Sequence, residues 1–129
     1  MLIGALDGSD PHHADARALL TAWRARGDAT MISVVNLSEV LVAPAADARL
    51  LRAARAAIAA LGVAIHSPTE SIGVDAARIR CRHPVSLPDA YLLATARHTA
   101  ATAASFDRRV GLAAAAENIP LATLTRLVP

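Results

Sequence analysis

Two periods of apolar residues alternate along this chain. Ala16, Leu19, Leu20 and Trp23 follow a helical spacing, whereas the β-branched run Thr30–Val35 predicts a buried strand. The same criteria predict helices over residues 10–27, 36–42, 45–60, 67–82, 88–99 and 107–117, and strands over residues 30–35, 63–65, 102–106 and 119–122. Strands that alternate with helices predict one α/β domain, residues 1–129, with a central parallel sheet in a three-layer α/β/α arrangement.

Local signals mark several boundaries of these elements. Gly27 and Gly62 are expected to end helices, and Asn118 permits a turn. Ser67-Pro68-Thr69-Glu70 has the form of a capping box. Asp107 is placed to cap the last helix.

Composition restricts the class of protein. The apolar fraction is 54% and the mean hydropathy is +0.39, which excludes a disordered chain. A net charge of +2 does not by itself indicate a nucleic-acid-binding protein. Cys81 is the single cysteine, so no intramolecular disulfide is possible. Without a membrane-spanning run or a basic leader, the protein is expected to be soluble and cytoplasmic.

Three acidic residues fall where parallel α/β sheets bind ligands, beyond the carboxyl ends of strands. Glu39 follows the strand at residues 30–35, Asp107 follows the strand at residues 102–106, and Asp89 opens a helix. Asp107 also suits an ordinary N-cap, and Asp89 also suits the helix dipole. Glu39 lies in an apolar segment and is expected to be half-buried, which is costly for a carboxylate unless it is paired or metal-bound.

A cluster of carboxylates has a definite chemistry. Carboxylates at one edge repel one another unless a cation joins them, and Mg²⁺ or Mn²⁺ prefers oxygen ligands. Such a cation activates water and neutralises charge on a phosphodiester. The sequence contains no P-loop, nucleotide-binding glycine motif or Cys/His zinc pattern that would compete, and the five histidines are interpreted as surface residues.

Four segments in order resemble the PIN domains of VapC-type toxins. They are the strand and acidic helix Ile32–Leu41, the LPDA helix start Leu87–Ala90, the SFDRR element Ser105–Arg109, and the DPHH opening at Asp10. The resemblance implies a Mg²⁺-dependent endoribonuclease, a homodimer, and a small antitoxin that wraps it. It also implies that Glu39, Asp89 and Asp107 are metal-site acids and that the Ser105 hydroxyl orients the last carboxylate.

The chain departs from the family pattern at its first strand. Met1–Asp7 resembles the segment that follows that strand, so the strand and its aspartate would precede Met1. Asp7-Gly8-Ser9 imitates the absent motif, which keeps Asp7 as an alternative first ligand. Because the first strand is central in such folds, we expect poor folding without it and recovery with an Asp-containing strand added upstream.

Other functions stay open from the sequence. A degenerate PIN-like domain that binds antitoxin or RNA without catalysis would also fit the loss of one acid. A response-regulator-like module is disfavoured because the chain has no lysine. Leu19, Leu20, Trp23 and Leu51 are expected to form an exposed apolar surface for the antitoxin or a second protomer.

Overall fold

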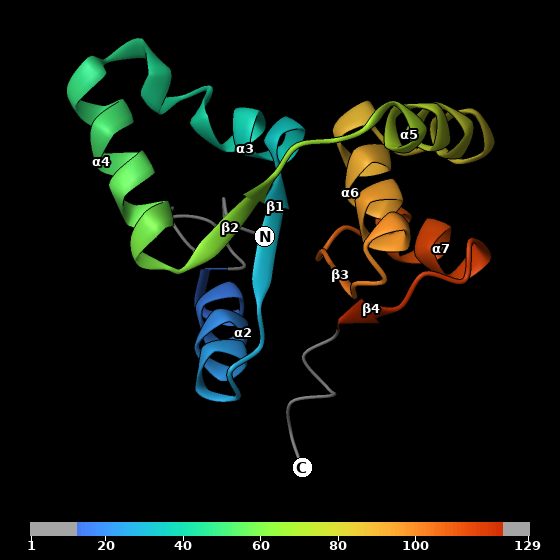
Figure 1. The fold of residues 1–129 in the computed structure, drawn as a ribbon, viewed down its shortest axis with the longest axis horizontal. Helices are drawn as coiled ribbons and strands as arrows, with labels where there is room; N and C mark the ends of the chain where they lie inside the picture. Colours follow the sequence, from blue (N-terminus) through green and yellow to red (C-terminus); the bar gives the residue numbers. More distant parts are fainter. Residues whose placement is uncertain (1–12, 123–129) are drawn as a thin grey trace.

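The computed structural model describes residues 13–122, which form an α/β arrangement of helices and short strands (Figure 1). Asp7 and the predicted helix start at Asp10 lie outside the described residues. In chain order the elements are α2 (His13–Ala25), β1 (Thr30–Ser33), α3 (Val34–Leu41), the 3-10 helix η1 (Pro44–Ala46), α4 (Ala48–Ala60), β2 (Val63–His66), α5 (Glu70–Arg82), α6 (Leu87–His98), β3 (Ala103–Ala104), α7 (Arg108–Ala116) and β4 (Leu121–Ala122).

All the strand pairs of the described residues are parallel, as predicted for this α/β fold. β1 pairs with β2 from Thr30–Val63 to Ser33–His66, and β3 pairs with β4 at Ala103–Leu121 and Ala104–Ala122. The two pairs are separate, however, so residues 13–122 form two small sheets rather than one continuous sheet. One edge of β1 and one edge of β3 therefore have no strand partner within this range.

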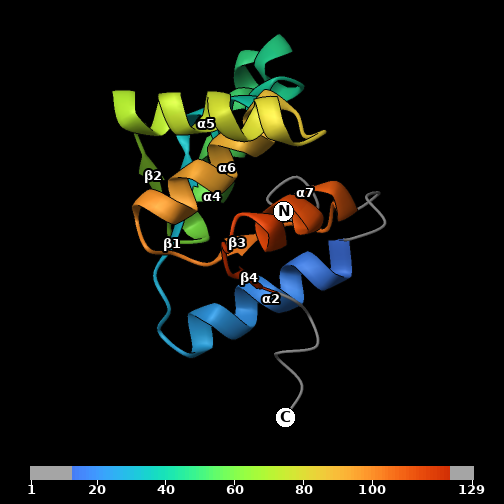
Figure 2. The ribbon, with the colours of Figure 1, turned by 90° about the vertical axis from the view of Figure 1, so that its right-hand side faces the viewer.

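Helix α6 connects the two strand pairs, because it contacts β1, β3 and α3. Figure 1 shows β1 and β2 between α4 and α6, with β4 below α6 and α7 to its lower right. The perpendicular view in Figure 2 places α5 and α2 at opposite ends of the molecule, in agreement with Figure 1. The acidic segment of α3 and the start of α6 thus belong to neighbouring elements.

Two predicted boundaries were wrong because short polar side chains compete for backbone N–H groups. The first strand ends at Ser33 instead of Val35, since the Ser33 hydroxyl accepts the Val35 N–H at 3.3 Å and starts α3. The predicted helix over residues 45–60 is divided at Asp47. That residue is extended, and its carboxylate accepts the N–H groups of Arg49 and Leu50 at 2.7 and 3.3 Å.

Two further details differ from the prediction, and the glycine helix ends are confirmed. Thr69, not Ser67, caps α5, and its hydroxyl accepts the Ile72 N–H at 3.2 Å. The last two strands are only two residues long each. Gly27 and Gly62 do end helices, at φ of 75° and 72°, and Asn118 has a left-handed φ of 57°.

The hydrophobic core lies among α5, α6, β3 and α7. Ile79, Leu93 and Val110 are fully buried at its centre. By contrast, α3 contains no buried residue and α4 contains only Ile58. No helix within residues 13–122 is long and apolar enough to cross a membrane.

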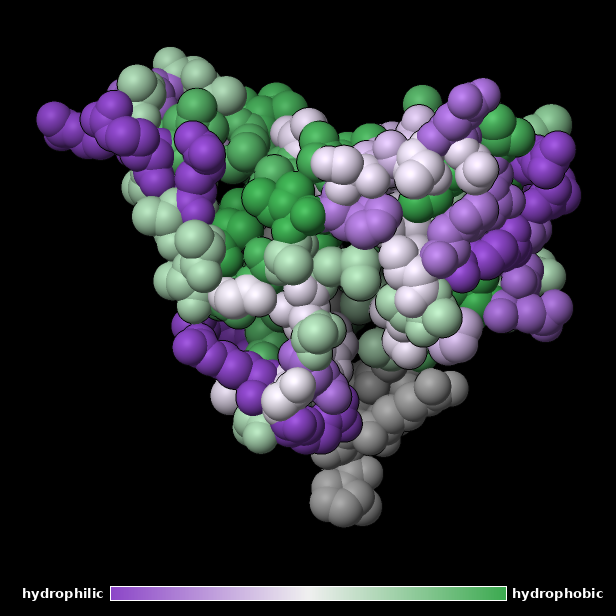
Figure 3. Space-filling model, viewed as in Figure 1, coloured by the Kyte–Doolittle hydropathy of each residue, from purple (hydrophilic) through white to green (hydrophobic). Residues whose placement is uncertain are grey.

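The exposed apolar surface differs from the expected one. Leu19 is buried, and Leu20, Trp23 and Leu51 are half-buried, so the predicted surface is not present as such. Helix α2 uses Leu19 to pack inward. The apolar surface visible in Figure 3 lies over β1, β2 and α3, where Met31, Val34 and Ile65 are exposed.

Candidate active site

A groove of about 590 Å³ lies where the two strand pairs fail to meet. Residues of α2, β1, α3, α6 and β3 line it, including the β1 and β3 strands, each of which has an edge without a strand partner in the described part of the chain. Its polar lining includes Ser33, Asn36, Glu39, Asp89, Thr95, Thr99 and Ser105. Two of the three predicted acids therefore face the same groove.

Glu39 reaches the groove from α3, which begins directly at the carboxyl end of β1. The prediction that this side chain is half-buried was wrong: Glu39 is exposed. The physical reason is that α3 lies on the surface and buries none of its residues. The desolvation argument for Glu39 is lost, but an exposed carboxylate remains accessible to a cation or a substrate.

Asp89 reaches the same groove from the first turn of α6 and is half-buried. The hydroxyl of Ser86 accepts the Asp89 backbone N–H at 3.2 Å and caps the helix. The cap of α6 is therefore provided by Ser86, so the Asp89 carboxylate is not required for it.

Asp107 is not among the residues that line the groove. Its carboxylate caps α7, accepting the Arg109 N–H at 2.8 Å, and lies 3.5 Å from the Arg109 guanidinium. The backbone hydrogen bond from Arg109 is the main reason that the pKa of Asp107 is lowered. Ser105 links it to the groove, because Ser105 lines the groove and its hydroxyl accepts the Asp107 N–H at 3.1 Å.

The donor atoms of the groove suit a hard cation. Within residues 13–122, no three His, Cys, Asp or Glu side chains lie close enough to form a complete metal site. Mg²⁺ commonly binds through one or two carboxylates and completes its shell with water and substrate phosphate. Glu39 and Asp89 provide two such carboxylates.

Two polar residues of this groove were not predicted from the sequence. Asn36 Nδ2 donates to the Pro88 carbonyl at 2.9 Å, and Thr95 is buried with no partner for its hydroxyl. The helical spacing from Asn36 to Glu39 was visible in the sequence and could have identified Asn36. The contact between Asn36 and Pro88 joins segments that are distant in the sequence, so no local sequence pattern indicated it.

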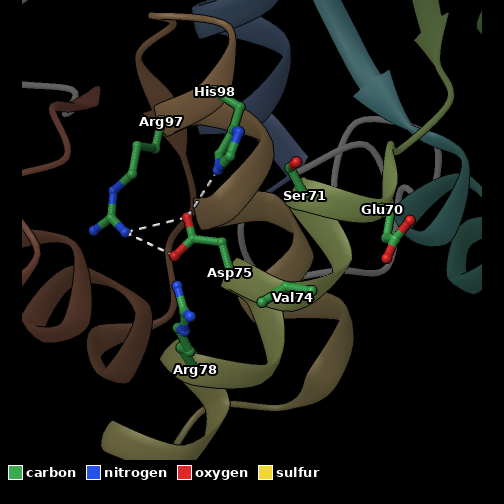
Figure 4. A pocket seen from close by; sticks show the side chains of 7 residues that line it. All are labelled: Glu70, Ser71, Val74, Asp75, Arg78, Arg97 and His98. Carbon is green, nitrogen blue, oxygen red and sulfur yellow. Dashed lines mark hydrogen bonds and ion pairs between the residues drawn. The ribbon is translucent and has the colours of Figure 1, made fainter.

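A second hollow, of about 560 Å³, lies between α5 and α6 (Figure 4). Arg97 Nη1 donates to both oxygens of Asp75, at 3.0 and 3.1 Å, and His98 Nε2 lies 3.2 Å from Asp75 Oδ2. Figure 4 shows both side chains directed at Asp75. Because these side chains already form hydrogen bonds with one another, we interpret them as a structural ion network and not as a ligand site.

Glu117 extends that ion network to the end of α7. Its carboxylate, with a side chain only 11% exposed, contacts Arg82 at 2.7 Å, Arg97 at 2.6 Å and His83 at 2.7 Å. The hydrogen bonds from Arg82, then Arg97 and His83, hold the pKa of Glu117 well below its usual range. His83 is thus half-buried in an ion network, contrary to its interpretation as a surface residue.

The chain resembles one protein family over most of its length. No similar chain was found among curated proteins or among solved structures. The model of the PIN domain family matches residues 1–118, which include Glu39, Asp89 and Asp107. The parallel α/β fold is that expected for the family, whose members are generally metal-dependent nucleases. The chain therefore belongs to the PIN domain family.

Proposed function

We propose that this protein is an endoribonuclease that hydrolyses RNA phosphodiester bonds with the help of Mg²⁺ or Mn²⁺ held in the groove. The observation that supports the proposal most strongly is that Glu39 and Asp89, from two different helices, line one groove. Family membership supports the same chemistry.

The residues of the groove have separate tasks in this proposal. Glu39 and Asp89 hold the cation. Asp107 is the third acid, and its backbone N–H donates to the hydroxyl of Ser105, which lines the groove. The low pKa of Asp107 keeps its carboxylate ionised, as a metal ligand must be. When bound, the cation neutralises charge on the scissile phosphate and activates water.

We further propose that the protein is the toxin of a toxin–antitoxin pair and acts as a homodimer. The sequence motifs of the VapC type support this assignment. The exposed apolar side chains of β1, β2 and α3 offer a surface for a second protomer or an antitoxin, because isolated small domains seldom leave such surface uncovered.

A second candidate is a degenerate PIN domain that binds RNA or antitoxin without cutting RNA. The lack of three clustered acids within residues 13–122 favours this candidate. The two candidates share the fold and differ only in chemistry, so an assay of cleavage distinguishes them.

The test measures cleavage of a fluorescent oligoribonucleotide with Mg²⁺, with Mn²⁺ and with EDTA. Glu39→Gln removes a carboxylate of the groove, and Glu70→Gln removes an exposed carboxylate of α5 that lies outside it. We expect cleavage that requires the cation and falls by about 100-fold or more in Glu39→Gln, because loss of a ligand should exceed the 10–100-fold effect of a supporting residue. Glu70→Gln should cleave normally.

Two results would reject the nuclease proposal. Cleavage that persists in EDTA would exclude a cation-dependent mechanism. A folded protein that binds the oligonucleotide but never cuts it, with either cation, would favour the degenerate PIN domain.

A further inference from the structure

The side-chain amide of Asn36 connects the two helices that present the groove acids. Asn36 precedes Glu39 by three residues on α3, so the two side chains emerge on neighbouring parts of the helix surface. Its Nδ2 donates to the carbonyl of Pro88, the residue directly before Asp89, at 2.9 Å. One hydrogen bond therefore joins α3, three residues before Glu39, to α6, one residue before Asp89.

The contact also fixes the orientation of the Asn36 amide. A carbonyl oxygen only accepts hydrogen bonds, so Nδ2 must face Pro88 and Oδ1 must face the other way. Oδ1 is buried and has no partner among the described residues, which is unfavourable for an amide oxygen. Asn36 thus has one committed donor and one free acceptor at the groove.

The other residues of α3 offer no equivalent connection. The helix buries none of its own residues. The Ser38 hydroxyl donates to the Val34 carbonyl of the same helix, at 3.0 Å. A surface helix held by few buried groups can shift relative to α6 unless a directional contact fixes it. The Asn36–Pro88 bond is a contact of that kind.

We propose that Asn36 is a positioning residue, which holds α3 against the start of α6 so that Glu39 and Asp89 bind one cation together. The inference rests on the proposed function of this groove and names a residue that supports it. Asn36 acts through the two carboxylates.

The test uses Mn²⁺ alone as the probe and measures its affinity by calorimetry, well below the unfolding temperature. Asn36→Leu removes the donor at similar size, Asn36→Gln keeps an amide, and Ser38→Ala is the matched control on the same helix. We expect Asn36→Leu to weaken Mn²⁺ binding by about tenfold. Asn36→Gln should recover most of that loss, and Ser38→Ala should bind like the parent.

A double-mutant cycle separates positioning from general loosening of the fold. In a Glu39→Gln background only one of the two carboxylates remains, so Asn36→Leu should have little further effect on Mn²⁺ affinity. General loosening would instead give the same loss in both backgrounds, which would overturn the proposal. If Asn36→Leu does not fold, Asn36→Ser, which is too short to reach Pro88, replaces it.

Failure of the inference and failure of the proposed function give different results. If the parent protein binds Mn²⁺ and a folded Asn36→Leu or Asn36→Ser variant binds it equally well, the positioning role alone is overturned. A parent protein that binds no Mn²⁺ rejects the cation site and the positioning role together.

Discussion

The N-terminal part of the molecule (residues 13–66) and the C-terminal part (residues 70–122) are stabilised in different ways. In the C-terminal part, helices α5, α6 and α7 enclose the main core, and Arg97 and Glu117 join them through charged hydrogen bonds. In the described N-terminal part, buried apolar residues are few, and α3 has none. The proposed site lies between the two, with Asp89 on the well-packed part and Glu39 on the loosely packed part.

This comparison shows that the two carboxylates of the groove are held in position to different degrees. Asp89 is placed by a helix with a full core behind it, whereas Glu39 depends on a surface helix. Regions with few buried contacts open more readily than packed cores. A directional contact such as Asn36–Pro88 is therefore most valuable on the side of Glu39.

The largest effect on stability should come from the core of the C-terminal part. Ile79 is fully buried, so Ile79→Ala should lower the free energy of unfolding by about 2–5 kcal/mol. The matched change Ile65→Ala, on a strand residue that is 57% exposed, should cost less than about 0.5 kcal/mol. Urea denaturation measures both, and equal losses would contradict the difference between the two parts.

The second effect concerns the edges of β1 and β3 that have no strand partner within residues 13–122. An N-terminal extension that ends in an Asp-containing strand should enter the groove and pair with both edges, adding about 3 kcal/mol from several hydrogen bonds. For a domain of this size, the unfolding temperature should rise by about 10 °C. An extension of equal length with alternating prolines, which cannot donate backbone hydrogen bonds, is the control. An equal rise with both extensions would exclude strand pairing.

The third and smallest effect concerns the ion network at Glu117. Glu117→Gln should lower the free energy of unfolding by about 2 kcal/mol near neutral pH, because charged hydrogen bonds to Arg82 and Arg97 are lost. The pKa of Glu117 is lowered in the folded state, so its contribution is present above about pH 4.3, the unfolded value. It is lost as the pH falls through the lower folded pKa.

Denaturation at a series of pH values measures this dependence, with Glu70→Gln as an exposed control on the same helix as Arg82. The difference in free energy of unfolding between the parent and Glu117→Gln should become smaller as the solution becomes acidic. A difference that stays constant down to strongly acidic pH would show that the carboxylate charge is not responsible.

Local signals in the sequence predicted what is decided locally. The cap of α7 at Asp107 and the left-handed residues Gly27 and Gly62 depend on neighbours in the chain, and they were predicted correctly. Ser33 and Asp47 were misjudged because each had two compatible roles, inside an element or at its cap. The outcome there depends on which backbone N–H group the side chain reaches.

Contacts between distant segments could not be predicted. The Asn36–Pro88 bond and the contact of Glu117 with Arg82 join residues that only the folded chain brings together. The prediction that Glu39 is half-buried was wrong for the same reason, because the burial of this side chain depends on what packs over α3. The three acids were predicted from local motifs, and their role in the site stays a prediction.

The most direct test of the central claim is Mg²⁺-dependent RNA cleavage by Asp89→Asn and Asp107→Asn, with Asp47→Asn as the control. Asp47 and Asp107 cap their helices, and Asn preserves a cap. Ser86 caps α6, so Asp89→Asn leaves that cap in place, and helix structure is retained in each variant. If the carboxylates of Asp89 and Asp107 bind the cation, both variants should lose about 100-fold or more in cleavage while Asp47→Asn cuts RNA normally. Cleavage at the parent rate in both Asp89→Asn and Asp107→Asn would contradict the account and leave these residues as structural features of their helices.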